Sequence, residues 1–112
     1  MDDWVPVALE DALPPDAVLS VCHEDKRIVL FRRGDKVYAL EDWCPHIGAM
    51  LSKGTFDQFT IQCPLHGVVY SVTTGAALSD PNWGPARPFP ARIRDGAIEI
   101  DWSKRAYTIP HP

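Results

Sequence analysis

The sequence has little positive charge, no long apolar run and few proline-free stretches, and each shortage excludes a class of protein. Eleven lysine and arginine residues stand against fifteen aspartate and glutamate residues, a net charge of −4 that disfavours nucleic acid as a partner. Uninterrupted apolar runs are only a few residues long, as in Ile28–Phe31, so we expect no membrane span. The longest window without any of the eleven prolines, residues 16–44, has the pattern of strands, which excludes a helix bundle.

Cysteine is also scarce. Three cysteines cannot all pair in disulfides, and the amino terminus opens with acidic residues where a secretory signal would be basic and apolar. We therefore expect a cytoplasmic protein whose cysteines serve metal binding or chemistry. The first 25 residues hold seven acidic residues and no lysine or arginine, which indicates either a solvated acidic face or a surface that steers basic partners.

The 112 residues suffice for one domain, and their apolar pattern predicts an all-β fold. Alternation with a period of two residues predicts a meander of strands in the first half and a hairpin around Asp95-Gly96 near the end. The expected strands are Ala17–His23, Lys26–Arg33, Lys36–Glu41, Ala91–Arg94 and Ala97–Trp102, with shorter runs at Phe59–Gln62 and Val68–Val72 and a helical turn at Leu9–Leu13.

Two short clusters of cysteine and histidine lie in a turn-rich stretch between residues 42 and 90. They are Cys44-Pro45-His46 and Cys63-Pro64-Leu65-His66, with sixteen residues between them. Structural zinc sites usually place two cysteines in one cluster and two histidines in another, whereas here each cluster holds one of each. This arrangement suits a dinuclear iron centre in which two histidines replace two cysteines on one iron. A disulfide between Cys44 and Cys63 would leave the matched histidines unexplained.

These clusters and the residues around them resemble the Rieske family, and within it the small ferredoxins that serve bacterial aromatic-ring and related oxygenases. The first matching pattern is Cys44-x-His46-x-Gly48-x-x-Leu51-Ser52-x-Gly54, and the second is Cys63-Pro64-Leu65-His66-Gly67, continued by Tyr70, Thr74-Gly75 and a loop around Pro81. The flanking strands match the family's base domain, so the resemblance covers nearly the whole chain.

The resemblance implies one Rieske 2Fe-2S cluster held by four side chains. Cys44 and Cys63 would bind an inner ferric iron, and His46 and His66 an outer iron that changes oxidation state. It also implies the Rieske fold, an antiparallel β-sandwich or barrel with an inserted subdomain. We expect a single domain with a base of about residues 1–41 and 86–112 and a cluster-binding subdomain of about residues 42–85.

Three positions depart from the respiratory branch of this family, and a fourth, Tyr70, agrees with it. Ala49 and Leu65 stand where that branch has two further cysteines joined in a disulfide, and Val68 stands where it has a serine directed at a bridging sulfide. Tyr70 occupies the place of a tyrosine that bonds a cysteine sulfur. Because hydrogen bonds to cluster sulfurs raise the reduction potential, these departures predict a low-potential centre.

The chain is too short to hold more than the cluster, so we expect an electron carrier and not an enzyme. The resemblance implies a monomer that takes single electrons from a flavin reductase and delivers them to a terminal oxygenase in aromatic hydrocarbon catabolism. The alternatives are an electron-entry subunit of a larger reductase, resembling the small subunit of assimilatory nitrite reductases, and a zinc-binding module. Outside the motif, we expect Cys22 in the core and His23 at the surface, because neighbours on a strand point to opposite faces.

Overall fold

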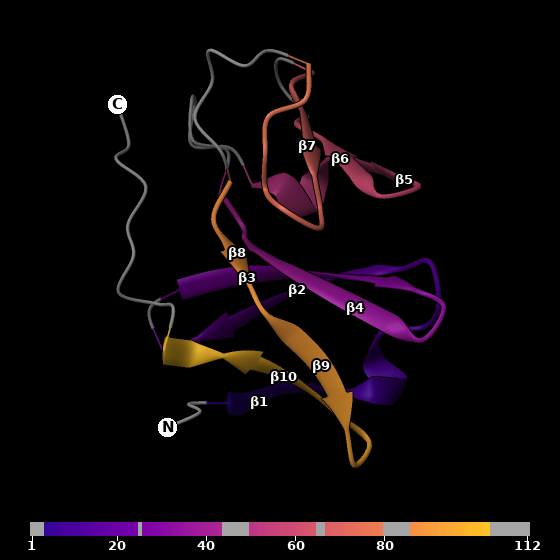
Figure 1. The fold of residues 1–112 in the computed structure, drawn as a ribbon, viewed down its shortest axis with the longest axis vertical. Helices are drawn as coiled ribbons and strands as arrows, with labels where there is room; N and C mark the ends of the chain where they lie inside the picture. Colours follow the sequence, from indigo (N-terminus) through magenta and orange to yellow (C-terminus); the bar gives the residue numbers. More distant parts are fainter. Residues whose placement is uncertain (1–3, 25, 44–49, 65–66, 80–85, 104–112) are drawn as a thin grey trace.

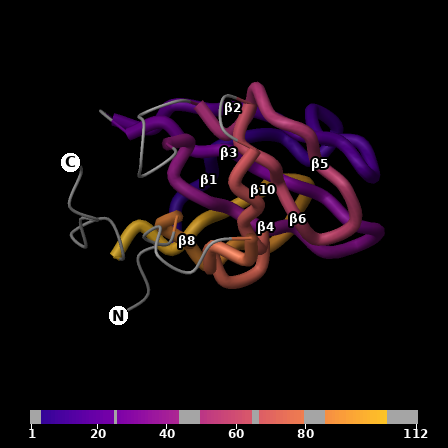
Figure 2. The backbone as a smooth tube through the Cα atoms, turned by 90° about the horizontal axis from the view of Figure 1, so that it is seen from above, coloured from indigo at the N-terminus to yellow at the C-terminus, as the bar shows by residue number. Residues whose placement is uncertain are grey.

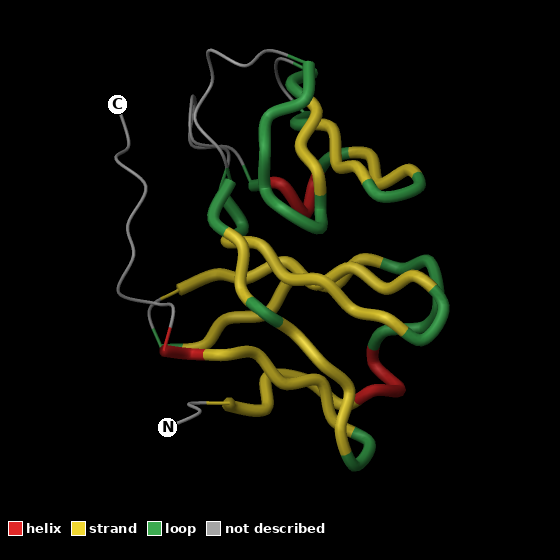
Figure 3. Tube along the Cα trace, viewed as in Figure 1, coloured by secondary structure: helices red, strands yellow, loops and turns green. Residues whose placement is uncertain are grey.

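The computed structural model of the chain describes residues 4–24, 26–43, 50–64, 67–79 and 86–103. In this part of the chain the backbone is almost entirely strand and turn, with the short 3-10 helices η1 (Glu10–Ala12) and η2 (Leu51–Lys53) (Figure 3). The strands form three antiparallel sheets, stacked with the four-stranded sheet in the middle (Figure 1). The all-β prediction is confirmed.

The middle sheet contains the predicted meander. Its order is β2-β3-β4-β8, with β2 (Val18–His23), β3 (Lys26–Arg33), β4 (Lys36–Glu41) and β8 (Pro88–Phe89). Gly34 makes the turn between β3 and β4 at a φ of 59°, a conformation that costs glycine little because it has no Cβ. The three meander strands begin and end within one residue of the predicted bounds.

A second sheet joins the two ends of the described chain. Its order is β1-β10-β9, with β1 (Trp4–Leu9), β10 (Ala97–Asp101) and β9 (Ala91–Arg94). The predicted hairpin is present, and Asp95 and Gly96 take φ values of 54° and 79°. Positive φ at both central residues is the signature of a tight turn whose twist matches the flanking strands.

The middle sheet is buried on both faces, which explains the uninterrupted apolar run in β3. Ile28 and Leu30 pack into a core shared with Ile98 and Ile100 of the β1-β10-β9 sheet, whereas Val29 and Phe31 face the opposite way. Alternate side chains of one strand therefore enter two different apolar cores.

The third sheet is β5-β6-β7, made of β5 (Thr55–Asp57), β6 (Thr60–Gln62) and β7 (Val69–Ser71). Together with η2, this sheet covers the face of the middle sheet that is opposite the β1-β10-β9 sheet. In the view from above, β5 and β6 project over the middle sheet (Figure 2). The core between them contains Phe31, Leu51, Ile61 and Tyr70. Such a separate small sheet is consistent with the predicted division into a base and a cluster-binding subdomain, which stays a prediction.

Among the described residues, no helix has the length and apolar character needed to cross a membrane. The sequence reasoning did not predict β1, β5, β8 or η2, whereas it did place a helical turn where η1 lies.

Candidate metal centre

Of the four expected ligands, Cys63 lies within the described residues, whereas Cys44, His46 and His66 lie outside them. Cys63 directly follows the last residue of β6, and its residue is 2% exposed. It is a free cysteine packed in the same apolar core as Leu51, Val68 and Tyr70. The apolar core therefore shields the thiol of Cys63 from solvent.

The backbone on both sides of His66 is closed into a tight loop. The N–H of Cys63 donates to the carbonyl oxygen of Val68 at 2.8 Å, and the N–H of Gly67 donates to the carbonyl oxygen of Cys63 at 3.2 Å. Gly67 has a φ of 72°, which an L side chain rarely adopts. The side-chain amide of Gln62 donates to the carbonyl oxygen of Gly67 at 3.3 Å and closes the loop a third time.

The described residues on the two sides of the segment that carries Cys44 and His46 are joined to one another and to the chain before Cys63. At the start, Asp42 is buried and its carboxylate accepts a hydrogen bond of 2.7 Å from the backbone N–H of Ser52, at the other end of the segment. Beyond η2, Gly54 lies against the backbone of Gln62, so closely that a Cβ on Gly54 would be 1.9 Å from the Gln62 carbonyl oxygen. Both segments that carry the expected ligands are therefore anchored to one another.

The loop around Pro81 has its own anchor on the same small sheet. Gly75 has a φ of 81°, and its carbonyl oxygen accepts a hydrogen bond of 2.7 Å from the N–H of Ala86. On the other side of the loop, the N–H of Leu78 donates to the carbonyl oxygen of Val69 at 2.7 Å. Pro81 itself lies outside the described residues.

The donor set and the described surroundings fit a 2Fe-2S cluster. Thiolate and imidazole are the ligands that Rieske centres use, and the one expected ligand that the structure describes is a buried free thiol. The hydroxyl oxygen of Ser52 is buried and has no hydrogen-bond partner among the described residues. Because buried polar groups are normally satisfied, such an oxygen suits the neighbourhood of a bound group that supplies an acceptor.

The prediction for the other cysteine and histidine pair is wrong in part. Cys22 is exposed, and His23 is half-buried with its ring edge-on to Trp102 at a centroid distance of 4.6 Å. Leu19 and Val21 on the same strand pack toward the core with Ile98, so alternation turns Cys22 outward. Among the described residues, no three histidine, cysteine, aspartate or glutamate side chains gather into a metal site.

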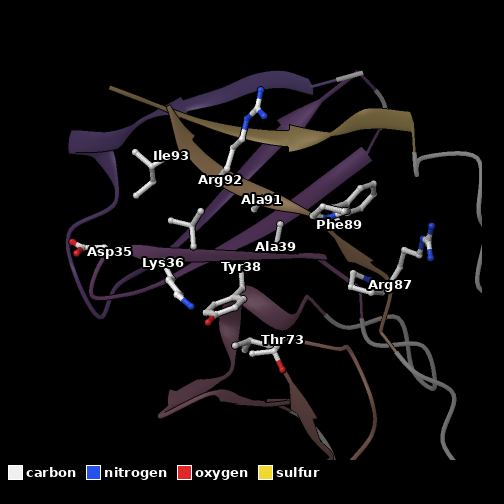
Figure 4. Close-up of a pocket in the computed structure, with 14 residues that line it drawn as sticks. Asp35, Lys36, Tyr38, Ala39, Thr73, Arg87, Phe89, Ala91, Arg92 and Ile93 are labelled. Atoms are coloured by element: carbon white, nitrogen blue, oxygen red, sulfur yellow. The ribbon is translucent and has the colours of Figure 1, made fainter. Parts of the chain in front are cut away.

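A groove among the described residues lies elsewhere. It has a volume of about 790 Å³ and opens between β4 and β9, with Tyr38 and Thr73 on one side and Ala91 and Ile93 on the other (Figure 4). Cys63 does not line it, and neither do the described residues that anchor the expected ligand segments. The candidate centre is therefore a loop site and not a pocket.

Comparison with known proteins decides the family. The model of the Rieske [2Fe-2S] domain matches residues 3–90. This chain belongs to the Rieske family. Its cofactor is one Rieske 2Fe-2S cluster, as the sequence predicted.

Three similar proteins indicate the kind of Rieske protein. The anthranilate 1,2-dioxygenase ferredoxin subunit of Burkholderia cepacia is 34% identical over 99 residues, which cover 88% of this chain and 92% of that protein. One chain in the complex of reduced oxygenase and oxidized ferredoxin in carbazole 1,9a-dioxygenase is 31% identical, with a TM-score of 0.80, over 90% of this chain and 94% of the other. A Mycobacterium tuberculosis protein described as an NADH-dependent nitrite reductase small subunit is 26% identical, with a TM-score of 0.77, over 89% and 95%.

The Rieske protein is thus an electron carrier of the ferredoxin kind and not a catalytic subunit. Sequence reasoning identified the family and the cofactor from the doubled motif. It missed Asp42 and Gln62, whose side chains close the two ligand segments. Asp42 carried one weak signal, an acidic residue directly after a strand and two positions before Cys44, and Gln62 carried none.

Proposed function

We propose that this Rieske protein carries single electrons from a flavin-dependent reductase to a terminal oxygenase that acts on an aromatic compound. The observation that carries the proposal is the near-complete overlap with one chain of an oxygenase–ferredoxin complex, 90% of this chain and 94% of the other. The match of residues 3–90 to the Rieske domain also supports an electron-carrying role.

We assign the cluster ligands to Cys44 and Cys63 on the inner iron and His46 and His66 on the outer iron. When bound, the cluster supplies a one-electron couple whose potential is raised by the two neutral imidazoles. Described residues beside the ligand segments support this role: backbone hydrogen bonds join Cys63 to Gly67 and Val68, and Cys63 lies in the same buried apolar core as Leu51. A rigid, dry site reduces the rearrangement that accompanies electron transfer.

The ligand assignment implies that two parts of the chain have different roles. The cluster-binding subdomain of about residues 42–85 carries the ligands, and the base of about residues 1–41 and 86–112 supports it. We place the protein in the cytoplasm as a monomer, because the exposed free thiol of Cys22 stays reduced there and would promote cross-linking in an oxidising compartment.

Reconstitution tests the proposed role. The purified holoprotein is combined with candidate reductase and terminal oxygenase pairs from aromatic dioxygenase systems, and product is measured against NADH consumed. Product formation that depends on this protein and saturates with its concentration is the expected result. If no oxygenase accepts electrons from the reduced protein, although the reductase reduces it, the oxygenase role is wrong.

The second candidate is a permanent electron-entry subunit of a nitrite reductase, and the likeness to the Mycobacterium tuberculosis protein favours it. Gel filtration of a native extract separates the two roles. A carrier elutes at the size of its own 12.5 kDa chain, whereas a subunit elutes with a much larger partner and with nitrite-reducing activity.

A further inference from the structure

Asp42 is the single charged residue that is fully buried among the described residues, with 1% of its surface exposed. Its carboxylate binds two separate elements. Oδ2 accepts a hydrogen bond of 2.9 Å from the hydroxyl of Ser20 in β2, and Oδ1 accepts one of 2.7 Å from the backbone N–H of Ser52 in η2. The backbone N–H of Asp42 donates to the carbonyl oxygen of Arg27 at 2.9 Å.

A buried carboxylate is a poor way to stabilise a fold. Removing the charge from water costs several kcal/mol, and an apolar residue of similar volume often serves stability better. Among the described side chains, none from arginine or lysine donates a hydrogen bond to the Asp42 carboxylate, whose donors are a hydroxyl and a backbone N–H. Buried polar groups of this kind are best understood by what they fix in place.

Asp42 and its partner Ser52 flank the segment that carries Cys44 and His46 in the sequence. Asp42 lies just before the segment and Ser52 just after it, ten positions along the chain. The bond between them closes that segment at its base, and the bond to Ser20 ties the closure to the middle sheet. Two residues past Ser52, Gly54 touches the backbone of Gln62, the neighbour of Cys63.

We propose that Asp42 is a positioning residue for the cluster: through Ser20 and Ser52 it sets the spacing of the first ligand segment and its place against Cys63. The proposal rests on the ligand assignment made above. Asp42 acts through its hydrogen bonds and not through its charge, so an asparagine can replace the aspartate. The amide oxygen would accept from the Ser52 N–H while the amide nitrogen donates to the Ser20 hydroxyl, which can turn to accept.

The test compares the wild-type holoprotein with Asp42→Ala, Asp42→Asn and Ser20→Ala. Three quantities are measured: the rate of cluster loss to excess iron chelator, the EPR g values of the reduced protein, and the reduction potential. We expect cluster loss to accelerate by about tenfold for each hydrogen bond removed, so that Ser20→Ala is intermediate and Asp42→Ala is fastest. Asp42→Asn should stay close to the wild type, and Asp42→Ala should shift the g values and the potential.

Ile98→Ala is the matched control for simple loss of stability. Ile98 is fully buried in the core between the middle sheet and the β1-β10-β9 sheet, which contains none of the residues hydrogen-bonded to Asp42. Its replacement should lower the unfolding temperature without shifting the g values or the potential. The positioning role is wrong if Asp42→Ala keeps wild-type g values and potential as Ile98→Ala does, or if Asp42→Asn behaves like Asp42→Ala.

Two outcomes need separate interpretation. If Asp42→Ala does not fold, the ranking of Ser20→Ala against Asp42→Asn decides, because Ser20 is exposed and its replacement is mild. Equal cluster loss in Ser20→Ala and the wild type then overturns the proposal. A wild-type protein without a Rieske EPR signal would instead overturn the ligand assignment, so the two failures are distinguishable.

Discussion

Gly54 touches the backbone carbonyl of Gln62, at a place where a Cβ would lie 1.9 Å from the oxygen. Gly54 follows the segment that carries Cys44 and His46, and Gln62 immediately precedes Cys63. β5 begins one residue after Gly54, and its Thr55 pairs with Gln62. The contact therefore joins the residues that flank the two ligand segments, and a residue with a side chain cannot fit there.

The first prediction concerns this contact. Gly54→Ala should lower the free energy of unfolding by about 3 kcal/mol or more and reduce the iron content of the purified protein, because backbone must move to admit the methyl group. The φ of Gly54 is −86°, so the cost is steric and not conformational. Chemical denaturation and iron and sulfide analysis measure the two effects.

Gly96→Ala is the control for the first prediction. Gly96 has a φ of 79°, but nothing lies within 4 Å of the position of an added Cβ. The replacement should cost about 1 kcal/mol of conformational strain and leave the cluster content unchanged. Equal cluster content in the two alanine variants would show that the Gly54 contact does not set the spacing of the ligand segments.

The second prediction tests the ligand assignment with two cysteines of different surroundings. Cys63→Ser should abolish the reddish-brown colour and the two irons and two labile sulfides of the purified protein, because serine is a weak ligand for iron. Cys22→Ser should leave all of these unchanged, since Cys22 is exposed on the edge strand β2. Visible absorption and metal analysis measure both. Retention of a full cluster in Cys63→Ser would remove Cys63 from the ligand set.

Two of the three strands that the sequence failed to predict, β1 and β8, contain proline. Pro6 lies in β1 and Pro88 in β8, and each strand forms an edge of its sheet. Proline cannot donate a backbone hydrogen bond, but on the open side of an edge strand no neighbouring strand needs that bond. In a sequence, however, a proline argues against a strand because the position of the strand in the sheet is not known. The meander was predictable because its alternation and its turn at Gly34 are local signals.

In the candidate site, too, the sequence predicted the local features and missed the contacts between distant residues. The ligand types and their spacing are local, and they were sufficient to predict a Rieske cluster. The anchors are not local: Asp42 binds Ser20, 22 positions away, and Ser52, 10 positions away, and no pattern in the sequence pairs them. Cys22 was misplaced because a short apolar side chain was taken as a sign of burial, whereas Leu19 and Val21 decide which face of β2 is inside.

The third prediction concerns Tyr70, which is fully buried in β7 and packs in the core with Cys63. The family resemblance places it where a tyrosine hydroxyl bonds a cysteine sulfur. Tyr70→Phe should lower the reduction potential by about 20–60 mV, the equivalent of one ordinary hydrogen bond for a one-electron couple. Protein-film voltammetry measures the shift. Tyr38→Phe is the control and should leave the potential unchanged, because the Tyr38 ring packs edge-on against Phe59.

The fourth prediction concerns Arg33, which joins the middle sheet to the β5-β6-β7 sheet. Its guanidinium carbon lies 4.4 Å from the centre of the Phe56 ring, and it also donates to the carbonyl oxygen of Gln58 and pairs with Asp16 at 2.6 Å. Arg33→Met should keep the apolar stem and lose the charge contacts, at a cost of about 1–2 kcal/mol in unfolding free energy. Denaturation of the holoprotein measures it, and unchanged EPR g values are expected; altered g values would contradict a purely supporting role.

The fifth prediction uses two exposed leucines to locate the surface that meets an electron-transfer partner. Leu78 is 56% exposed and is held by its backbone to Val69, in the small sheet that follows Cys63, whereas Leu9 is 70% exposed at the end of β1 in the base. We expect the partner to dock beside this small sheet, where an exposed apolar side chain contributes to a small transient interface, so Leu78→Ser should raise the KM of the oxygenase for this protein by about tenfold at unchanged potential. Leu9→Ser should leave the KM unchanged. The two leucines are both largely exposed, but only Leu78 lies beside the small sheet. Equal effects of the two replacements would therefore place the docking surface elsewhere.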